Sequence, residues 1–246
     1  MKIRQLMIAG CFVFQACISA ASVDWATVEL RAKYSTKYNG MKIDAIKTLS
    51  KNADNEYEDR LDASSLLGKI QQIARFTLDE TGQLVPLTYL NKRTLLGIKR
   101  SETQTFDWAK KQAIYMKKGS PVTTGIELGV LDLPTHYLQL RRDLHAGRKK
   151  FEYELIRRGQ RRTYAYRWLG KEHVNTSVGE LETDMFVLER DDQKRQTKLW
   201  LASNWGYLLV KLEQTEEKDH YTMQLEEAVI AGQAVTPKRS ATKDSL

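Results

Sequence analysis

The side chains best suited to metal binding or proton transfer are four histidines, His136, His145, His173 and His220. None has a partner at a metal-ligand spacing; His136 and His145 lie nine residues apart and would point in different directions on a helix. The chain contains no Gly-x-Ser-x-Gly turn, phosphate-binding glycine loop or dinucleotide fingerprint. We therefore expect no metal site, no cofactor and no enzymatic activity.

Three carboxylates, Glu180, Glu182 and Asp184, raise the alternative of glycoside hydrolysis, which uses a pair of such groups. A spacing of two residues places all three on one face of a strand, where they mark the polar end of that face. A glycan hydrolase that uses Glu182 or His173 is consequently the weakest of three functional hypotheses.

The most unusual local feature is a basic cluster interleaved with aromatic residues. Its members are Arg141, Arg142, Arg148, Lys149, Lys150, Arg157, Arg158, Arg161 and Arg162. Such a pattern can imitate a nucleic-acid platform, but the pairing described below turns the aromatic side chains inward. Two interpretations stay open: a solvated basic rim, or a site at Arg157, Arg158, Arg161 and Arg162 for phosphate head groups or acidic glycans.

The first residues of this cluster lie at the end of a predicted helix. Leu133, Tyr137, Leu140 and Leu144 share one helical face, and Asp132 and Gly147 suit the two ends of a helix of about 12 residues. A helix of this length is marginal alone, so its apolar face must be covered.

The segment after the helix is a predicted β-hairpin, which we expect to cover the apolar face of the helix. Alternation over 151–157 and 162–169, around a turn at Gly159-Gln160, pairs Leu155 with Tyr164, Tyr153 with Tyr166 and Phe151 with Trp168. The aromatic side chains then share one face, which we expect to pack on the helix.

The rest of the chain is rich in period-two alternation, beginning with residues 26–34, the turn Asn39-Gly40 and a return over 41–49. Together these segments predict about ten strands. The predicted fold class is therefore mainly β: a strongly curved antiparallel sheet, an open half-barrel, wrapping one central short α-helix.

The N-terminus has the pattern of a secretory signal, with Lys2 and Arg4 before an apolar run that is too short to span a membrane. We expect cleavage within residues 1–21, a single domain over 22–235, a disordered tail over 236–246, and a periplasmic location. Lipoprotein anchoring at Cys17 is a minority interpretation. Both cysteines, Cys11 and Cys17, fall in the signal, and the mature chain would carry 37 basic and 31 acidic residues.

Several short motifs resemble the bacterial exported domain-of-unknown-function family 3108. They are Leu138-Gln139-Leu140-Arg141, Gly82-Gln83-Leu84-Val85-Pro86, Leu199-Trp200-Leu201-Ala202 and Val210-Lys211-Leu212. The resemblance covers about residues 25–230 and implies an exported Gram-negative envelope protein with a curved antiparallel sheet. Asn204-Trp205 and Leu208-Leu209 depart from the family pattern. The family carries no established activity to transfer.

The leading hypothesis is a non-enzymatic periplasmic binding module for a lipid or other apolar envelope ligand. The ligand would lie on the concave face against Tyr137, Tyr153, Tyr164, Tyr166 and Trp168. The alternative is an envelope assembly or interaction protein with a filled core and no ligand. The expected partners are a lipid, an anionic envelope glycan or an envelope protein, with no nucleic acid, and the expected state is a monomer.

Overall fold

The computed structural model describes residues 29–38, 41–190, 195–217 and 219–237. These residues form fifteen strands, one α-helix and one short 3₁₀ helix, η1. The elements are β1 Leu30–Tyr38, β2 Met41–Lys51, β3 Tyr57–Ser64, β4 Gly68–Leu78, β5 Leu84–Leu95, β6 Ile98–Asp107, β7 Gln112–Lys117, β8 Ser120–Gly125, α1 Thr135–His145, β9 Glu152–Arg157, β10 Gln160–Thr176, β11 Gly179–Arg190, β12 Arg195–Ala202, η1 Ser203–Trp205, β13 Leu208–Glu216, β14 Asp219–Ile230 and β15 Gln233–Ala234.

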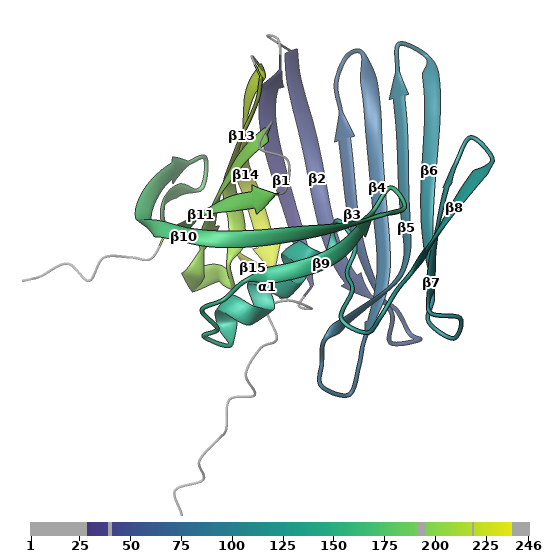
Figure 1. The fold of residues 1–246 in the computed structure, drawn as a ribbon. Helices are drawn as coiled ribbons and strands as arrows, with labels where there is room; N and C mark the ends of the chain where they lie inside the picture. Colours follow the sequence, from purple (N-terminus) through teal and green to yellow (C-terminus); the bar gives the residue numbers. More distant parts are fainter. Residues whose placement is uncertain (1–28, 39–40, 191–194, 218, 238–246) are drawn as a thin grey trace, which may run out of the picture.

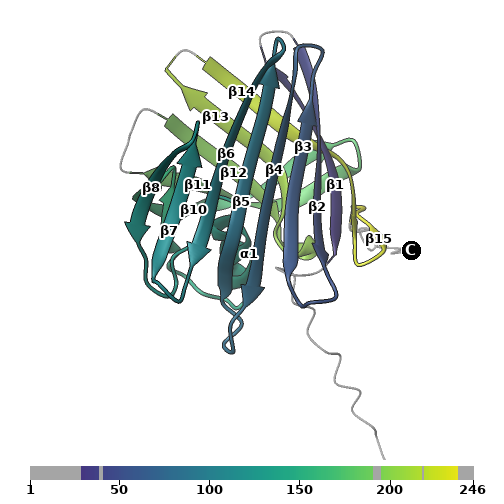
Figure 2. The ribbon, with the colours of Figure 1, turned by 90° about the vertical axis from the view of Figure 1, so that its right-hand side faces the viewer.

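All fifteen strands belong to one antiparallel sheet, in the order β8-β7-β6-β5-β4-β3-β2-β1-β14-β13-β12-β11-β10-β9, with β15 paired to β14. The sheet curls so that β1–β8 and β9–β14 face each other across the interior, with α1 between them (Figures 1 and 2). The predicted class, a mainly β and strongly curved antiparallel sheet around one helix, is confirmed. The strand number is higher than the expected ten, because polar segments such as β3 and β8 carry little apolar alternation and still pair.

The sheet does not close into a barrel, because its two end strands, β8 and β9, share no ladder of backbone hydrogen bonds. Side chains bridge this seam instead: the Thr124 hydroxyl donates to the Gly159 carbonyl oxygen at 2.7 Å, and Gln104 Nε2 donates to the Ile156 carbonyl oxygen at 3.1 Å. The free edge of β9 is covered by a parallel bridge between Leu131 and Leu155. The interior is therefore nearly enclosed on that side.

Helix α1 is buried on almost every side rather than along one apolar stripe. Its buried side chains include His136, Gln139, Arg141 and Asp143 as well as Leu138 and Leu140. The reason is its position inside the curl, where both walls of the sheet approach it. Burying polar groups is tolerated where they are hydrogen-bonded, and the packing therefore depends on polar contacts that the apolar spacing did not reveal.

Both expected helix ends are present. The Asp132 carboxylate accepts hydrogen bonds from the Thr135 backbone N–H at 2.8 Å and from its hydroxyl at 2.6 Å, just before the first turn. At the other end Gly147 has a φ of +73°, and the Arg148 N–H donates to the Asp143 carbonyl oxygen. This is the left-handed ending that glycine favours.

The β9–β10 hairpin differs from its predicted register by two residues. Its turn is Arg158-Gly159, with φ values of +53° and +70°, so Tyr153 pairs with Tyr164 rather than Tyr166. Two positive φ values give the turn the twist that matches its flanking strands. Because the shift is even, the side chains keep their predicted faces.

Some expectations fall outside the described residues: the signal 1–21 with Cys11 and Cys17, the turn Asn39-Gly40, and residues 238–246 of the expected tail. The first residue of that tail, Thr236, contacts the body, since its carbonyl oxygen accepts a hydrogen bond from Trp205 Nε1 at 3.1 Å. The one helix in the described part of the chain is too short and too polar to cross a membrane.

Candidate functional site

The four tyrosines expected to line an apolar ligand site are part of the core around α1, and their hydroxyls are occupied. Tyr153 donates to Asp143 Oδ2 at 2.9 Å, and Tyr137 donates to the Tyr207 carbonyl oxygen at 3.3 Å. The Tyr166 hydroxyl lies 2.8 Å from His136 Nε2, and the Tyr164 hydroxyl accepts from Arg157 at 3.2 Å. Tyr153 and Tyr166, the helix-facing tyrosines, therefore hold the helix to the sheet, while Tyr137 lies on the helix and Tyr164 bonds within the hairpin.

Trp168, the fifth member of that set, is 54% exposed and does not shelter in the core as expected. A bulge between Trp168 and Gly170 shifts the register of β10, and the indole N–H donates to Asp184 Oδ1 at 2.9 Å. Trp168 lines a hollow of about 620 Å³ beside the C-terminal end of α1 with Phe151 and Phe186. The expectation that this side chain is sheltered is wrong, although Trp168 lies on the same face of the sheet as its partner Phe186.

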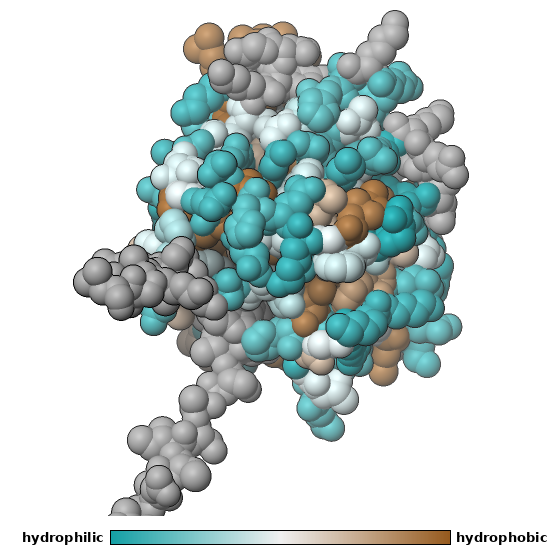
Figure 3. Space-filling view, turned by 90° about the vertical axis from the view of Figure 1, so that its left-hand side faces the viewer, coloured by the Kyte–Doolittle hydropathy of each residue, from teal (hydrophilic) through white to brown (hydrophobic). Residues whose placement is uncertain are grey.

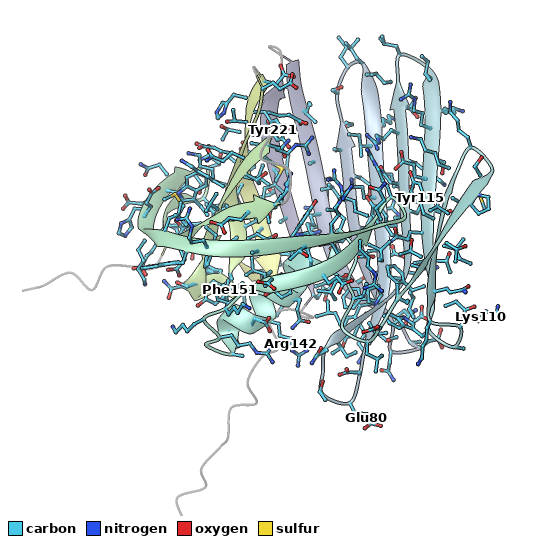
Figure 4. The ribbon with its side chains drawn as sticks, viewed as in Figure 1. Glu80, Lys110, Tyr115, Arg142, Phe151 and Tyr221 are labelled. Carbon is cyan, nitrogen blue, oxygen red and sulfur yellow. The ribbon has the colours of Figure 1, made fainter. Side chains whose placement is uncertain are left out.

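A cavity of about 400 Å³ lies in the other half of the interior, between the two walls of the sheet. We name it the arginine cavity. It is lined by Ile70, Gln72, Tyr89, Asn91, Arg93, Glu102, Gln104, Tyr115, Leu133, Ile156, Arg157, Arg158, Arg195 and Tyr221. Tyr115 on β7 and Tyr221 on β14 come from its opposite sides (Figure 4). The cavity thus draws on strands from both walls of the sheet and on the β9–β10 hairpin.

The side chains on the concave face change from apolar to polar along the strands. On β4 and β5 it is apolar at one end, where Ala74, Phe76 and Leu84 are buried. Further along, the same inward positions carry Gln72, Asn91 and Arg93, which line the arginine cavity. The core therefore ends partway along the strands and a polar chamber begins.

Positive charge predominates in the arginine cavity, where four arginines and one carboxylate are among the lining side chains. The carboxylate, Glu102, is 7% exposed and lies 3.5 Å from Arg93, 3.7 Å from Arg158 and 3.8 Å from Lys117. Arg195 pairs with Glu216, and Arg157 donates to the Tyr164 hydroxyl. Because one carboxylate is shared among several cations, the electrostatic potential in this partly enclosed space is positive. A positive potential favours the binding of an anion.

Two buried oxygen atoms in the cavity wall have no hydrogen-bond partner within the described part of the protein: the Tyr89 hydroxyl and the Asn91 Oδ1. Leaving such a group unpaired costs about 1–3 kcal/mol. Burial raises the pKa of Tyr89, with the nearby Asp132 carboxylate adding to the effect, and burial likewise raises the pKa of Tyr115 and Tyr221. All three phenols are therefore neutral; the Tyr221 hydroxyl donates to the Gln214 side chain at 2.8 Å, and the Tyr89 hydroxyl is able to donate to an oxygen atom of a ligand.

Asp132 lies close to Tyr89 and adjoins Leu133, which lines the cavity. It is fully buried, and burial raises its pKa to about 6 although the Thr135 hydroxyl and N–H bond to it. Its second oxygen, Oδ2, has no partner among the described residues. This side of the chamber therefore carries a carboxyl group that gains its proton at mildly acidic pH.

The predicted anion site at the hairpin divides into two halves. Arg157 and Arg158 line the arginine cavity. Arg161 instead pairs with Glu154 and donates to the Gly125 carbonyl oxygen, and Arg162 is exposed and donates to the Gln160 side chain. Arg157 ends β9 and Arg158 lies in the turn, and both line the cavity, whereas Arg161 and Arg162 lie on β10 outside its lining.

The candidate catalytic groups lie elsewhere and are engaged. Glu182 forms an ion pair with Lys171 at 2.7 Å, Asp184 accepts from Trp168, and His173 is exposed on β10. Among the described residues that line the arginine cavity, none is a histidine, cysteine, serine or lysine. No group of three His, Cys, Asp or Glu side chains in the described ranges is placed to hold a metal ion. The chemistry that this chamber offers is hydrogen bonding and charge, which suits binding.

The sequence did carry a signal for the residues that were missed. Gln72, Asn91, Glu102 and Gln104 occupy inward positions in strands whose other inward residues are apolar. A polar residue at a core-facing position of a period-two strand costs stability unless it is satisfied. Polar residues at inward positions of three consecutive strands indicate that part of the interior is polar.

Comparison with one solved structure supports the fold. The crystal structure of a beta-barrel-like protein of domain of unknown function DUF1849 from Brucella abortus aligns with a TM-score of 0.57 at 11% identity, covering 83% of this chain and 98% of that one. The complex structure of Pseudomonas aeruginosa MucA/MucB aligns with a TM-score of 0.37 at 13% identity. The alignment covers 88% of this chain but only 55% of the matched chain, so this chain spans about half of that protein's length. A putative lipoprotein from Parabacteroides distasonis aligns at 0.32 and 9% identity, covering 83% of this chain and 96% of that one.

No curated protein matches the sequence. The pattern of one family, described as "Protein of unknown function (DUF3108)", matches residues 33–226. That range runs from β1 to β14 and includes α1 and the whole arginine cavity. The chain therefore belongs to this family of proteins of unknown function, DUF3108.

Proposed function

We propose that this protein is a non-enzymatic binding module of the bacterial cell envelope, which takes the anionic, oxygen-rich group of an amphipathic envelope molecule into the arginine cavity. The N-terminal pattern of a cleaved signal over residues 1–21 supports export to the periplasm. The family match adds no activity to the proposal, since the family's function is unknown.

The observation that carries the proposal is the combination of excess arginine with buried oxygens that lack partners. Arg93, Arg157, Arg158 and Arg195 approach the same chamber from three parts of the sheet. Guanidinium groups form paired hydrogen bonds to phosphate and carboxylate oxygens. The unpartnered hydroxyl of Tyr89 supplies an additional donor. A phosphate or carboxylate head group can accept hydrogen bonds from the arginines and from this hydroxyl at once.

This placement changes the original hypothesis about the ligand's position. An apolar ligand cannot lie against the helix-facing tyrosines, because α1 occupies that space. The apolar part of a ligand would instead extend past Ile70, which is 40% exposed at the cavity wall.

Calorimetric titration of the mature protein tests the proposal with three probes: inorganic phosphate, short-chain phosphatidylglycerol and short-chain diacylglycerol. We expect binding of phosphatidylglycerol, weaker binding of phosphate and none of diacylglycerol, because only the first two carry the anion. Phosphate binding alone, with no gain from the lipid, would identify the ligand as a free anion.

Arg158→Gln removes one cavity charge, and Arg162→Gln removes the same charge from an exposed position of the same hairpin that does not line the cavity. We expect the first to weaken binding about tenfold or more and the second to change it by less than about twofold, since hydrogen bonds to charged groups contribute about 1.5–3 kcal/mol. Equal effects of the two substitutions would refute a specific site.

The packed half of the interior favours a second candidate, an assembly or interaction protein of the envelope. There α1 fills the space between the walls, and Leu138 and Leu140 are fully buried. This candidate gains support if none of the three probes binds and a partner captured from envelope extract is lost when Arg157 and Arg158 are replaced by glutamate.

A further inference from the structure

Two neighbouring hairpin turns place large apolar side chains in water at one end of the sheet. Leu66 and Leu67, in the turn from β3 to β4, are 94% and 38% exposed. Leu95, Leu96 and Ile98, in the turn from β5 to β6, are 60%, 70% and 62% exposed. Both turns lie at the upper end of the molecule in Figure 1, and Figure 3 shows apolar side chains along its upper edge. We name these five residues the tip patch.

Backbone contacts hold the two turns together. The Leu96 N–H donates to the Leu67 carbonyl oxygen at 2.9 Å, and Gly68 pairs with Leu95 across β4 and β5. Within its own turn Ser65 donates to the Gly68 carbonyl oxygen. The tip patch is therefore a preformed apolar surface, which needs little ordering before it contacts a partner.

Leucine is an unfavourable choice at the tip. Leu96 and Gly97 form a two-residue turn with φ values of +49° and +80°, positions where Asn, Asp and Gly are strongly preferred. A left-handed conformation strains an L residue that carries a large side chain. The strain and the exposure of Leu96 occur at the same residue, which indicates a role outside the fold.

Basic residues predominate around the tip patch. The segments 64–70, 92–101 and 116–120 contain no Asp or Glu. Their basic residues are Lys69, Lys92, Arg93, Lys99, Arg100, Lys117 and Lys118, of which Arg93 and Lys117 pair with Glu102. Apolar side chains that project beyond a ring of lysines match the layout of a bilayer whose head groups are negative.

We propose that the tip patch docks the protein on an anionic phospholipid surface, with the leucines in the interface and the lysines on the phosphates. The proposal stands on the hairpin tips alone and goes beyond the function assigned to the arginine cavity. Ile70 and Arg93 line that cavity only a few residues along β4 and β5 from the tips. Docking would therefore bring the chamber close to the membrane surface.

Vesicle co-sedimentation of the mature protein tests the docking. We expect binding to vesicles of phosphatidylglycerol with phosphatidylethanolamine, a decrease as salt is added, and little binding to vesicles of phosphatidylcholine alone. The double substitution Leu66→Ser with Leu96→Asn should reduce the partition coefficient at least about tenfold, because two apolar side chains leave the interface. Lys99→Glu with Lys118→Glu should reduce it by a similar factor, since each basic residue near an anionic surface contributes about fivefold.

Leu128→Ser is the matched control, because Leu128 is 85% exposed but lies outside the hairpin turns. It should leave vesicle binding unchanged. The tip variants should also bind soluble short-chain phosphatidylglycerol as the unsubstituted protein does, which separates docking from the arginine cavity. The proposal is overturned if the protein ignores anionic vesicles, or if Leu128→Ser weakens binding as much as the tip substitutions.

Discussion

The Tyr166 hydroxyl lies 2.8 Å from His136 Nε2, while the other ring nitrogen of His136 faces the Asp132 carbonyl oxygen at 3.3 Å. This arrangement assigns the proton to Nδ1, so that Nε2 accepts from Tyr166. The two rings stack with 5.9 Å between their centroids. A neutral histidine thus joins strand β10 to helix α1 in the middle of the core.

Burial lowers the pKa of His136 to about 4, although backbone hydrogen bonds oppose this shift. A lowered folded-state pKa contributes stability that is present above the unfolded value, about 6.5, and is lost as pH falls through 4. Asp132 acts in the opposite sense, because its raised pKa of about 6 gives stability at low pH that is lost as pH rises. Comparing the protein with His136→Gln isolates the histidine.

We expect the free energy of unfolding of the unsubstituted protein, relative to His136→Gln, to fall by about 3 kcal/mol between about pH 7.5 and about pH 4. Denaturant unfolding at several pH values measures this difference. A difference between the two proteins that stays constant with pH would show that His136 is not a buried neutral group.

The Asp143 carboxylate is 4% exposed and accepts hydrogen bonds from Tyr153 and Gln139, each at 2.9 Å. Tyr153→Phe removes one of these donors, and we expect it to lower the free energy of unfolding by about 2 kcal/mol. Tyr89→Phe is the control, because the Tyr89 hydroxyl has no partner among the described residues. It should cost nothing measurable, and equal losses from the two substitutions would contradict the assigned contacts.

Leu96→Asn should stabilise the isolated protein by about 0.5–1 kcal/mol, because asparagine tolerates the left-handed conformation that Leu96 adopts. Leu95→Asn, in the adjoining strand, should bring no such gain. Thermal unfolding of the two variants measures the contrast. A loss of stability in Leu96→Asn would show that the leucine is needed for folding rather than for docking.

Trp168→Ala should cost less than about 1.5 kcal/mol, because the indole is half exposed outside the core. Phe186→Ala should cost about 3–5 kcal/mol, since Phe186 is 1% exposed. Denaturant midpoints of the two variants give the comparison. If Trp168→Ala proved the more damaging, the side chain would belong to the core after all.

The fold followed from the sequence where apolar alternation is regular. The inward faces of Tyr153, Tyr164 and Tyr166 were predictable because the alternation continues through the hairpin, and an error of two residues in register preserves them. The exposure of Trp168 was not predictable, because alternation assigns its face, which it shares with Phe186, but does not show that this part of the face is left uncovered.

The candidate site was harder to predict, because it is assembled from distant segments. Arg157 and Arg158 were visible as part of a basic cluster, but Arg93 and Arg195 meet them only when the sheet curls. The buried polar side chains of α1 were hard to predict for the same reason, because Gln139 and Arg141 bond to the backbone of the distant residues Leu84 and Gly206. Alternation predicts which face a residue occupies and leaves its distant neighbours undetermined.

The central claim is that the ligand's anion enters the arginine cavity rather than the space around α1. Chemical shifts of isotopically labelled tyrosine rings and of the Asn91 side chain, recorded as short-chain phosphatidylglycerol is added, test it most directly. We predict that the signals of Tyr89, Tyr115, Tyr221 and Asn91 move, while those of Tyr153 and Tyr166 do not. Shifts confined to Tyr153 and Tyr166, or no shifts at saturating lipid, would contradict the claim.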